Sequence, residues 1–148
     1  MPGSIEILLV EASPNDIELT LHAFKRHKLA NRIEVVRDGE EALVALGANE
    51  GARPRPVDQH PQVILLDLKL PKVGGLEVLR RLKAHDHLKT IPVVVLTSSR
   101  EEPDIAAAYA LGANSYIVKP VDFDRFTEAV RELGLYWLLL NQRPIAPV

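Results

Sequence analysis

Short apolar runs alternate along the chain with longer stretches in which apolar residues recur every three or four positions. Such runs are typical of buried strands, and the longer stretches are typical of helices. The expected strands lie at 5–10, 33–36, 62–67, 91–97 and 115–119. The expected helices follow them, at 14–28, 38–47, 74–85, 101–112 and from about Asp122 to residue 140. Pro14 suits the start of the first helix, and Gly47 suits the end of the second.

Five successive β–α units with almost wholly apolar strands predict a parallel sheet that is covered by helices on both faces. We therefore expect a single α/β domain over 1–148, with a doubly wound five-stranded sheet. The segment 47–61 is rich in Pro, Gly and charge and has no apolar period. We interpret it as a surface loop insertion before the third strand, and not as a linker, because no second domain follows.

Composition excludes several classes of function. The net charge of −2 gives no electrostatic reason to expect nucleic acid or an anionic membrane as a partner. The absence of cysteine excludes disulfides, thiolate metal sites and cysteine nucleophiles. The apolar run near the N-terminus is too short for a signal peptide or a membrane span. These features predict a soluble, cytoplasmic protein.

Polar residues close four of the five expected strands. In an open parallel sheet, ligands bind beyond the carboxyl ends of the strands. The strand-end residues are Glu11, Asp67, Thr97 and Lys119. This set suits phosphoryl transfer to a carboxylate, with Asp67 as the nucleophile and with Thr97 and Lys119 holding charge on the phosphoryl oxygens. A hard divalent cation would bridge the carboxylates and the phosphoryl group.

Each of these residues also has an ordinary interpretation. An Asp after a strand is often a helix cap, Ser98 or Ser99 could cap the helix that follows, and Lys119-Pro120 could be a simple turn. Asp67, however, precedes its helix by several residues and caps nothing obvious. The placement of all four side chains at successive strand ends favours the functional interpretation.

Three motifs carry a resemblance to response-regulator receiver domains, over nearly the whole chain. They are "LLDLKLP" with Asp67, "VVVLTSS" with Thr97 thirty positions later, and "ANSYIVKP" with Lys119 fifty-two positions after the Asp. The resemblance implies a flavodoxin-like fold with strand order 2-1-3-4-5 and five helices. It also implies that Asp67 accepts a phosphoryl group from a phosphohistidine of a sensor histidine kinase, with Mg²⁺ present.

The resemblance assigns further roles around this site. Thr97 and Lys119 would contact the phosphoryl oxygens, and Tyr116 would change rotamer together with Thr97 to transmit the signal. Lys119-Pro120 resembles the family's cis-peptide turn. The metal ligands would be Glu11 acting through water, Asp67, and the backbone carbonyl of Lys69.

The loop insertion and the ending "LGLYWLLLNQRPIAP" resemble the small regulators that are partnered with bacterial phytochromes. This implies a stand-alone receiver with a bacteriophytochrome histidine kinase as its partner. It also implies a homodimer formed through the fourth helix, the fifth strand, the fifth helix and a C-terminal extension at 134–148.

The apolar stripe at 133–140 has two interpretations. Side chains at helical spacing would pack on the domain's own sheet: Leu133, Tyr136, Trp137 and Leu140. Leu135, Leu138 and Leu139 then point elsewhere, and an exposed apolar patch marks an interface. The predicted dimer interface consists of Tyr136, Trp137, Leu138 and Leu139.

The chain departs from the family at position 12, where an acidic residue that binds the metal directly is usual. Ala12 stands there, and a methyl group cannot ligate Mg²⁺. We therefore predict weak Mg²⁺ binding. Asp16 lies in the following helix and is expected to support its first turn without replacing the lost ligand. Lys69 has two interpretations: its ammonium lies in solvent, or it takes the place of the metal.

Three functions compete. The favoured one is a response regulator that has no output domain, signals by protein contact and has no enzymatic activity beyond its own phosphorylation and dephosphorylation. The alternative is a phosphorylation-independent pseudo-receiver, which would be an interaction module that lost metal-dependent switching with Ala12. An aspartyl-nucleophile phosphatase is disfavoured, because those enzymes need an acid two residues after the nucleophile, where this chain has Lys69.

Overall fold

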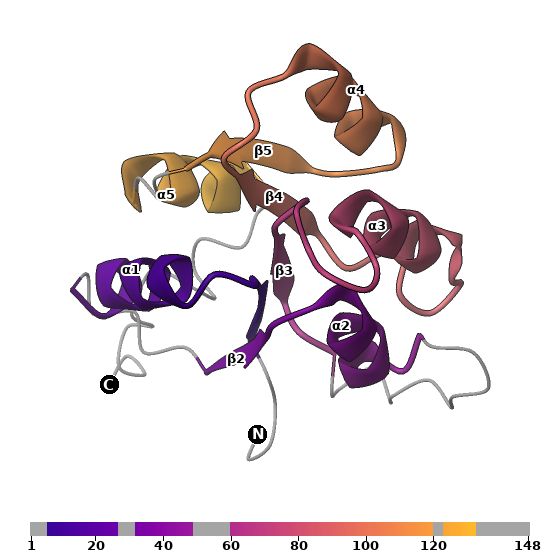
Figure 1. Cartoon of the computed structure of the whole chain (residues 1–148), viewed down its shortest axis with the longest axis horizontal. Coiled ribbons are helices and arrows are strands. Elements are labelled where there is room, and N and C mark those ends of the chain that lie inside the picture. The colour runs from indigo at the N-terminus through magenta and orange to yellow at the C-terminus, as the bar shows by residue number, and fades with distance from the viewer. Residues whose placement is uncertain (1–5, 27–31, 49–59, 120–122, 133–148) are drawn as a thin grey trace, which may run out of the picture.

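The computed structural model describes residues 6–26, 32–48, 60–119 and 123–132 (Figure 1). Its strands are β1 (Ile7–Val10), β2 (Ile33–Val36), β3 (Val63–Leu66), β4 (Val93–Thr97) and β5 (Ser115–Val118). Its helices are α1 (Pro14–Arg26), α2 (Gly39–Leu46), α3 (Gly75–Ala84), α4 (Glu102–Ala110) and α5 (Phe123–Glu132). The strands and helices expected from the sequence are confirmed, and within the described residues their ends agree to within two residues.

The five strands form one parallel sheet in the order β2-β1-β3-β4-β5. The chain runs from β1 outward to β2 and then crosses back over β1 to β3. Leu8 of β1 therefore pairs with Glu34 of β2 on one side and with Ile64 of β3 on the other. The predicted doubly wound, flavodoxin-like topology is confirmed, and its strand order reverses between β1 and β3, where such folds bind their ligands.

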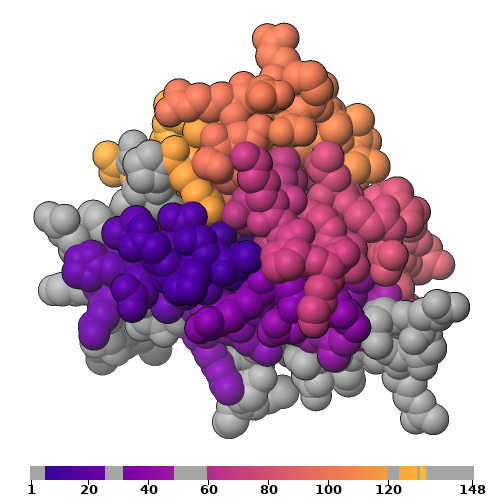
Figure 2. All heavy atoms as spheres, viewed as in Figure 1, coloured from indigo at the N-terminus to yellow at the C-terminus, as the bar shows by residue number. Residues whose placement is uncertain are grey.

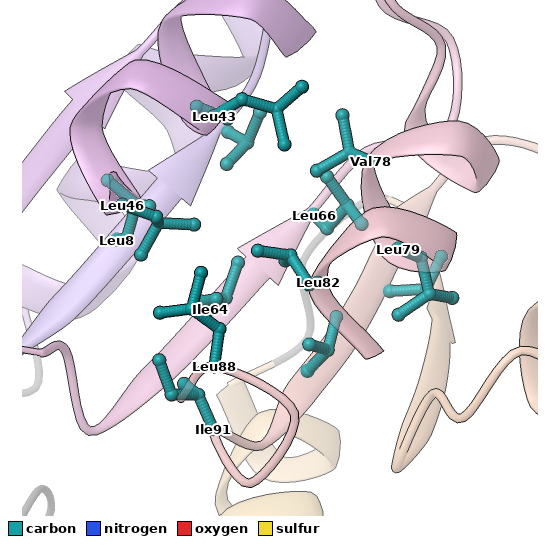
Figure 3. Close-up of a cluster of buried hydrophobic side chains, with 14 of the residues drawn as sticks. Leu8, Leu43, Leu46, Ile64, Leu66, Val78, Leu79, Leu82, Leu88 and Ile91 are labelled. Atoms are coloured by element: carbon teal, nitrogen blue, oxygen red, sulfur yellow. The ribbon is translucent and has the colours of Figure 1, made fainter. Parts of the chain in front are cut away.

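The sheet separates two hydrophobic layers, because successive residues of a strand point to opposite faces. One layer packs α2, α3 and α4 on the sheet. Figure 3 shows its centre, where Leu43 and Leu46 of α2 and Leu82 of α3 lie around Leu8, Ile64 and Leu66. The other layer packs α1 and α5 on the opposite face, where the rings of Phe24 and Phe126 lie 4.7 Å apart. Figure 1 shows the same division, with α1 and α5 on one side of the strands and α2 and α3 on the other.

Local hydrogen bonds set the helix ends. Asp38 caps α2 by accepting a hydrogen bond from the Glu41 amide at 2.8 Å, and Gly47 ends α2 in the left-handed region with φ 71°. Ser13 precedes α1, and its hydroxyl oxygen accepts a hydrogen bond from the Asp16 amide at 3.2 Å. This bond holds Asp16 in the first turn of α1, next to the carboxyl end of β1.

Several predictions fall on residues outside the described ranges. They concern most of the loop insertion at 47–61, the Lys119-Pro120 peptide bond, the C-terminal extension at 134–148 and the dimer-interface residues Tyr136, Trp137, Leu138 and Leu139. Within the described ranges, no helix has the length and apolar character needed to cross a membrane.

Candidate functional site

Two carboxylates lie where the strand order reverses. Glu11 follows β1, and its amide donates to the Val36 carbonyl at 3.0 Å, while Asp67 follows β3 and its amide donates to the Val10 carbonyl at 3.0 Å. These bonds extend the sheet ladder by one residue and fix both side chains at the same edge. Glu11 is 2% exposed and Asp67 is 6% exposed, so both carboxylates are largely removed from water.

The ammonium of Lys119 lies among three carboxylates. Its Nζ contacts Glu11 Oε1 and lies 2.9 Å from Asp16 Oδ2 and 3.0 Å from Asp67 Oδ2. The Lys119 amide donates to the Thr97 carbonyl at 2.8 Å, which places this residue directly beyond β5. Its side chain is 10% exposed. The structure therefore brings together Glu11, Asp67, Thr97 and Lys119, as the sequence predicted.

The pKa values of Glu11 and Asp67 are shifted in opposite directions. Burial raises the pKa of Glu11 to about 7, although the hydrogen bond from Lys119 acts in the opposite direction, and the nearby Asp67 raises this pKa further. Burial would also raise the pKa of Asp67, but hydrogen bonds from Glu11, Lys119 and Thr97 outweigh it and hold that pKa below its usual value. Burial opposes the charge on Lys119, but its three carboxylate partners raise the pKa of the ammonium above its usual value. Asp67 is therefore the carboxylate of this pair that is ionised at neutral pH.

A network of hydroxyl groups continues from Thr97 toward α4 and β5. The Ser99 amide donates to Thr97 Oγ1 at 3.5 Å, and the Tyr116 hydroxyl donates to the Ser99 carbonyl at 3.0 Å. The Ser99 hydroxyl donates to Asp104 Oδ2 at 2.5 Å and accepts from the Glu101 amide at 3.4 Å. Glu101 is the N-cap of α4 and no side chain caps it, so the capping role that the sequence allowed for Ser98 or Ser99 is not formed; the Ser99 hydroxyl instead joins the turn before α4 to Asp104.

The loop between β3 and α3 is packed tightly around Asp67. Asp67 Oδ1 accepts a hydrogen bond from the Lys69 amide at 3.3 Å, so Asp67 closes a local turn and caps no helix. The Gly75 amide donates to the Leu68 carbonyl at 2.9 Å. A Cβ on Gly75 would lie 2.2 Å from the Asp67 carbonyl oxygen, so only glycine fits there without a shift of the backbone.

Lys69 does not lie between the carboxylates. Its side chain is exposed, and it forms no ion pair with any residue that the structure describes. The ammonium between Glu11 and Asp67 belongs to Lys119. Of the two interpretations of Lys69, the one with its charge in solvent describes this structure.

Asp16 has a contact that the sequence reasoning missed. We expected it only to support the first turn of α1, and its amide does bond to Ser13 there. Its carboxylate, however, also reaches Lys119 across 103 positions of sequence. Figure 2 shows the indigo α1 segment against the magenta segment that follows β3. The sequence did contain a topological signal: only three residues separate the end of β1 from the start of α1, so α1 must begin at the same sheet edge as the site.

The described residues do not fit a divalent cation. Mg²⁺ demands near-octahedral oxygen coordination. At this edge Ala12 offers a methyl group, and Glu11 Oε1 and Asp67 Oδ2 both contact the Lys119 ammonium. Nowhere in the described ranges does a group of three His, Asp or Glu side chains form a candidate metal site.

Residues 7–131 match the family model described as "Response regulator receiver domain". The chain belongs to the response-regulator receiver family. It is 43% identical over 138 residues to "Probable methanogenesis regulatory protein FilR2" of Methanothrix harundinacea, covering 93% of this chain and 86% of that protein. It is 38% identical over 140 residues to "Response regulator Rcp1" of Synechocystis sp., covering 95% of this chain and 93% of Rcp1.

Solved structures give the same assignment. The bacteriophytochrome response regulator AtBRR is 52% identical, with a TM-score of 0.78 over 95% of this chain and all (100%) of AtBRR. An Mn²⁺-bound form of Rcp1 is 35% identical, with a TM-score of 0.70 over 97% of this chain and 99% of Rcp1. The chain is thus a receiver-domain response regulator of two-component signalling with phytochrome-associated relatives.

Proposed function

We propose that this response regulator accepts a phosphoryl group on Asp67 from a phosphohistidine of a sensor histidine kinase and signals by protein contact. The observation that carries the proposal is the convergence of Asp67, Thr97 and Lys119 at one sheet edge. A buried, ionised carboxylate beside a fixed ammonium and a hydroxyl is a set of protein groups that suits acyl phosphate formation.

The transfer follows from these positions. A carboxylate oxygen of Asp67 attacks phosphorus and forms the P–O bond of an acyl phosphate, while the P–N bond to the kinase imidazole breaks. The electron pair of that bond leaves with the imidazole, which takes up a proton from solvent. Lys119, 3.0 Å from Asp67 Oδ2, and the Thr97 hydroxyl then bind the phosphoryl oxygens.

Transmission to the surface would run through the hydroxyl network. If Thr97 turns toward a phosphoryl group, the hydrogen bond from the Ser99 amide to its hydroxyl is lost. Because the Ser99 carbonyl accepts from the Tyr116 hydroxyl, a shift of Ser99 would then reach Tyr116. We therefore infer that Thr97 and Tyr116 are the switch residues. The exposed ring of Tyr109 lies 6.5 Å from that of Tyr116, which gives α4 and β5 an aromatic surface that can respond.

The relatives support a proposal about the partners. AtBRR is a bacteriophytochrome response regulator, and we infer a bacteriophytochrome histidine kinase as the phosphoryl donor of this cytoplasmic chain. We also infer a homodimer through α4, β5 and α5 together with the C-terminal extension. The sequence of that extension, with Tyr136, Trp137, Leu138 and Leu139, supplies the apolar residues for it.

A second function is favoured by one specific observation. Ala12 lacks the carboxylate that binds metal in the family, so phosphorylation assisted by Mg²⁺ would be weak. If phosphorylation does not occur at all, the chain is a phosphorylation-independent pseudo-receiver that binds its partner in a single state.

Intact mass after exposure to phosphoramidate, with Mg²⁺ or with chelator, separates the two functions. We expect slow labelling of the native chain, faster Mg²⁺-dependent labelling of Ala12→Asp, and none of Asp67→Asn. If only Ala12→Asp is labelled, even when a cognate kinase is added, the native chain is a pseudo-receiver. Equal labelling of Asp67→Asn would place the phosphoacceptor elsewhere.

A further inference from the structure

The Lys119 ammonium has three N–H donors, and each contacts a different carboxylate. Two of these carboxylates, on Glu11 and Asp67, stand at strand ends. The third, on Asp16, comes from α1, and its Oδ2 lies 2.9 Å from Lys119 Nζ. The Ser13 cap fixes the first turn of α1 and with it the backbone of Asp16.

The charges in this cluster are unbalanced. Among the residues that the structure describes, Lys119 is the one cation within ion-pair distance of Asp67. A phosphoryl group on Asp67 would add negative charge and needs at least one donor of that ammonium. Asp16 occupies one of the three donors and brings a further negative charge close to the incoming group, although its side chain is 34% exposed and partly screened by water.

We propose that Asp16 restrains Lys119 as a competing acceptor and thereby slows phosphorylation of Asp67. This inference rests on the proposed function. Asp16 touches neither the phosphoryl group nor its donor, and it acts through Lys119 as a positioning residue. The restraint matters in this chain because Ala12 offers no metal ligand, so Lys119 is the positive charge that remains beside Asp67.

Asp16→Asn removes the charge but keeps the shape of the side chain. We expect this variant to be labelled by phosphoramidate in chelator about threefold to tenfold faster than the native chain, a range set by the modest strength of a partly exposed ion pair. Glu18→Gln is the matched control, because it removes the same charge from an exposed position of the same helix. It should leave the rate unchanged.

Two further measurements separate restraint from a structural role. Asp16→Glu restores a carboxylate and should return the rate toward that of the native chain, and the advantage of Asp16→Asn should shrink as salt screens the charge. Circular dichroism during urea unfolding checks that both variants fold as the native chain does. A rate for Asp16→Asn equal to or below the native rate overturns the inference.

The same experiment distinguishes failure of the inference from failure of the proposed function. If Ala12→Asp with Mg²⁺ is labelled while Asp16→Asn is no faster than the native chain, only the role of Asp16 is wrong. If neither Ala12→Asp nor Asp16→Asn is labelled by phosphoramidate or by a kinase, the phosphoacceptor role of Asp67 fails, and the inference fails with it.

Discussion

The site has two halves with different chemistry. The charged half, at the ends of β1, β3 and β5, consists of Glu11, Asp16, Asp67 and Lys119. The hydroxyl half, between β4, β5 and α4, consists of Thr97, Ser99, Asp104 and Tyr116. The charged half contains Ala12, where the resemblance predicts an acidic residue. In the hydroxyl half, by contrast, each acceptor oxygen described above has a hydrogen-bond donor.

In the function we propose, this difference separates reception of a phosphoryl group from transmission of its effect. The two halves meet at Thr97, whose hydroxyl helps to lower the pKa of Asp67 and accepts a hydrogen bond from the Ser99 amide. A change in the charged half should therefore alter labelling, while a change in the hydroxyl half should alter only its consequences. Four pairs of variants test this division.

Lys119→Ala should have the largest effect. It leaves three clustered carboxylates without their cation, and we expect the free energy of unfolding to fall by about 3 kcal/mol and labelling of Asp67 to be lost. Urea denaturation and intact mass measure the two effects. Lys72→Ala is the control: this exposed lysine lies 3.7 Å from Asp38, and its loss should cost less than about 1 kcal/mol. Equal losses would contradict the special position of Lys119.

Gly75→Ala should be next, because its Cβ would lie 2.2 Å from the Asp67 carbonyl oxygen and 2.5 Å from Leu68 Cα. We expect a loss of about 2 kcal/mol and slower labelling, because the loop that carries Asp67 must move. Gly74→Ala, where a Cβ meets nothing within 4 Å, should cost less, about 0.5–1 kcal/mol, because alanine is poorer than glycine at this N-cap of α3. Thermal unfolding of both variants would decide, and similar melting temperatures would argue against a tight fit at Gly75.

Ser99→Ala should have a moderate effect. It removes the donor to Asp104 and the acceptor for the Glu101 amide, and we expect a loss of about 1–2 kcal/mol with labelling of Asp67 unchanged. The neighbouring Ser98 is exposed, and Ser98→Ala should be neutral in both measurements. Slower labelling of Ser99→Ala would show that the two halves are not separable.

Tyr116→Phe should have the smallest effect on stability. It removes one hydrogen bond, from the Tyr116 hydroxyl to the Ser99 carbonyl, and we expect a loss of about 1 kcal/mol. Labelling should be normal, but the amide resonances of α4 should no longer shift when Asp67 is phosphorylated. Tyr109→Phe alters an exposed ring and should preserve that response. If only Tyr109→Phe loses this response, the switch residue is Tyr109 on α4 and not Tyr116.

The sequence by itself determined the elements, the parallel sheet and four of the site residues. Apolar runs of strand length leave little choice of structure, and right-handed crossovers bring all strand ends to one edge. Glu11, Asp67, Thr97 and Lys119 could therefore be placed together from their positions alone. That Ala12 stands where the family has a metal-binding acid stays a prediction from the resemblance.

Only the tertiary structure decided how these charges pair. Asp16 and Lys119 are 103 positions apart, and a helical carboxylate with a good local role gives no sign of a second partner. Similarly, Lys69 and Lys119 both stand beside strand ends, and only the packed chain showed that Lys119 reaches the carboxylates while Lys69 stays exposed. Strand ends are set by local hydrophobic pattern, whereas the direction of a long, flexible side chain depends on which charges the folded sheet brings within its reach.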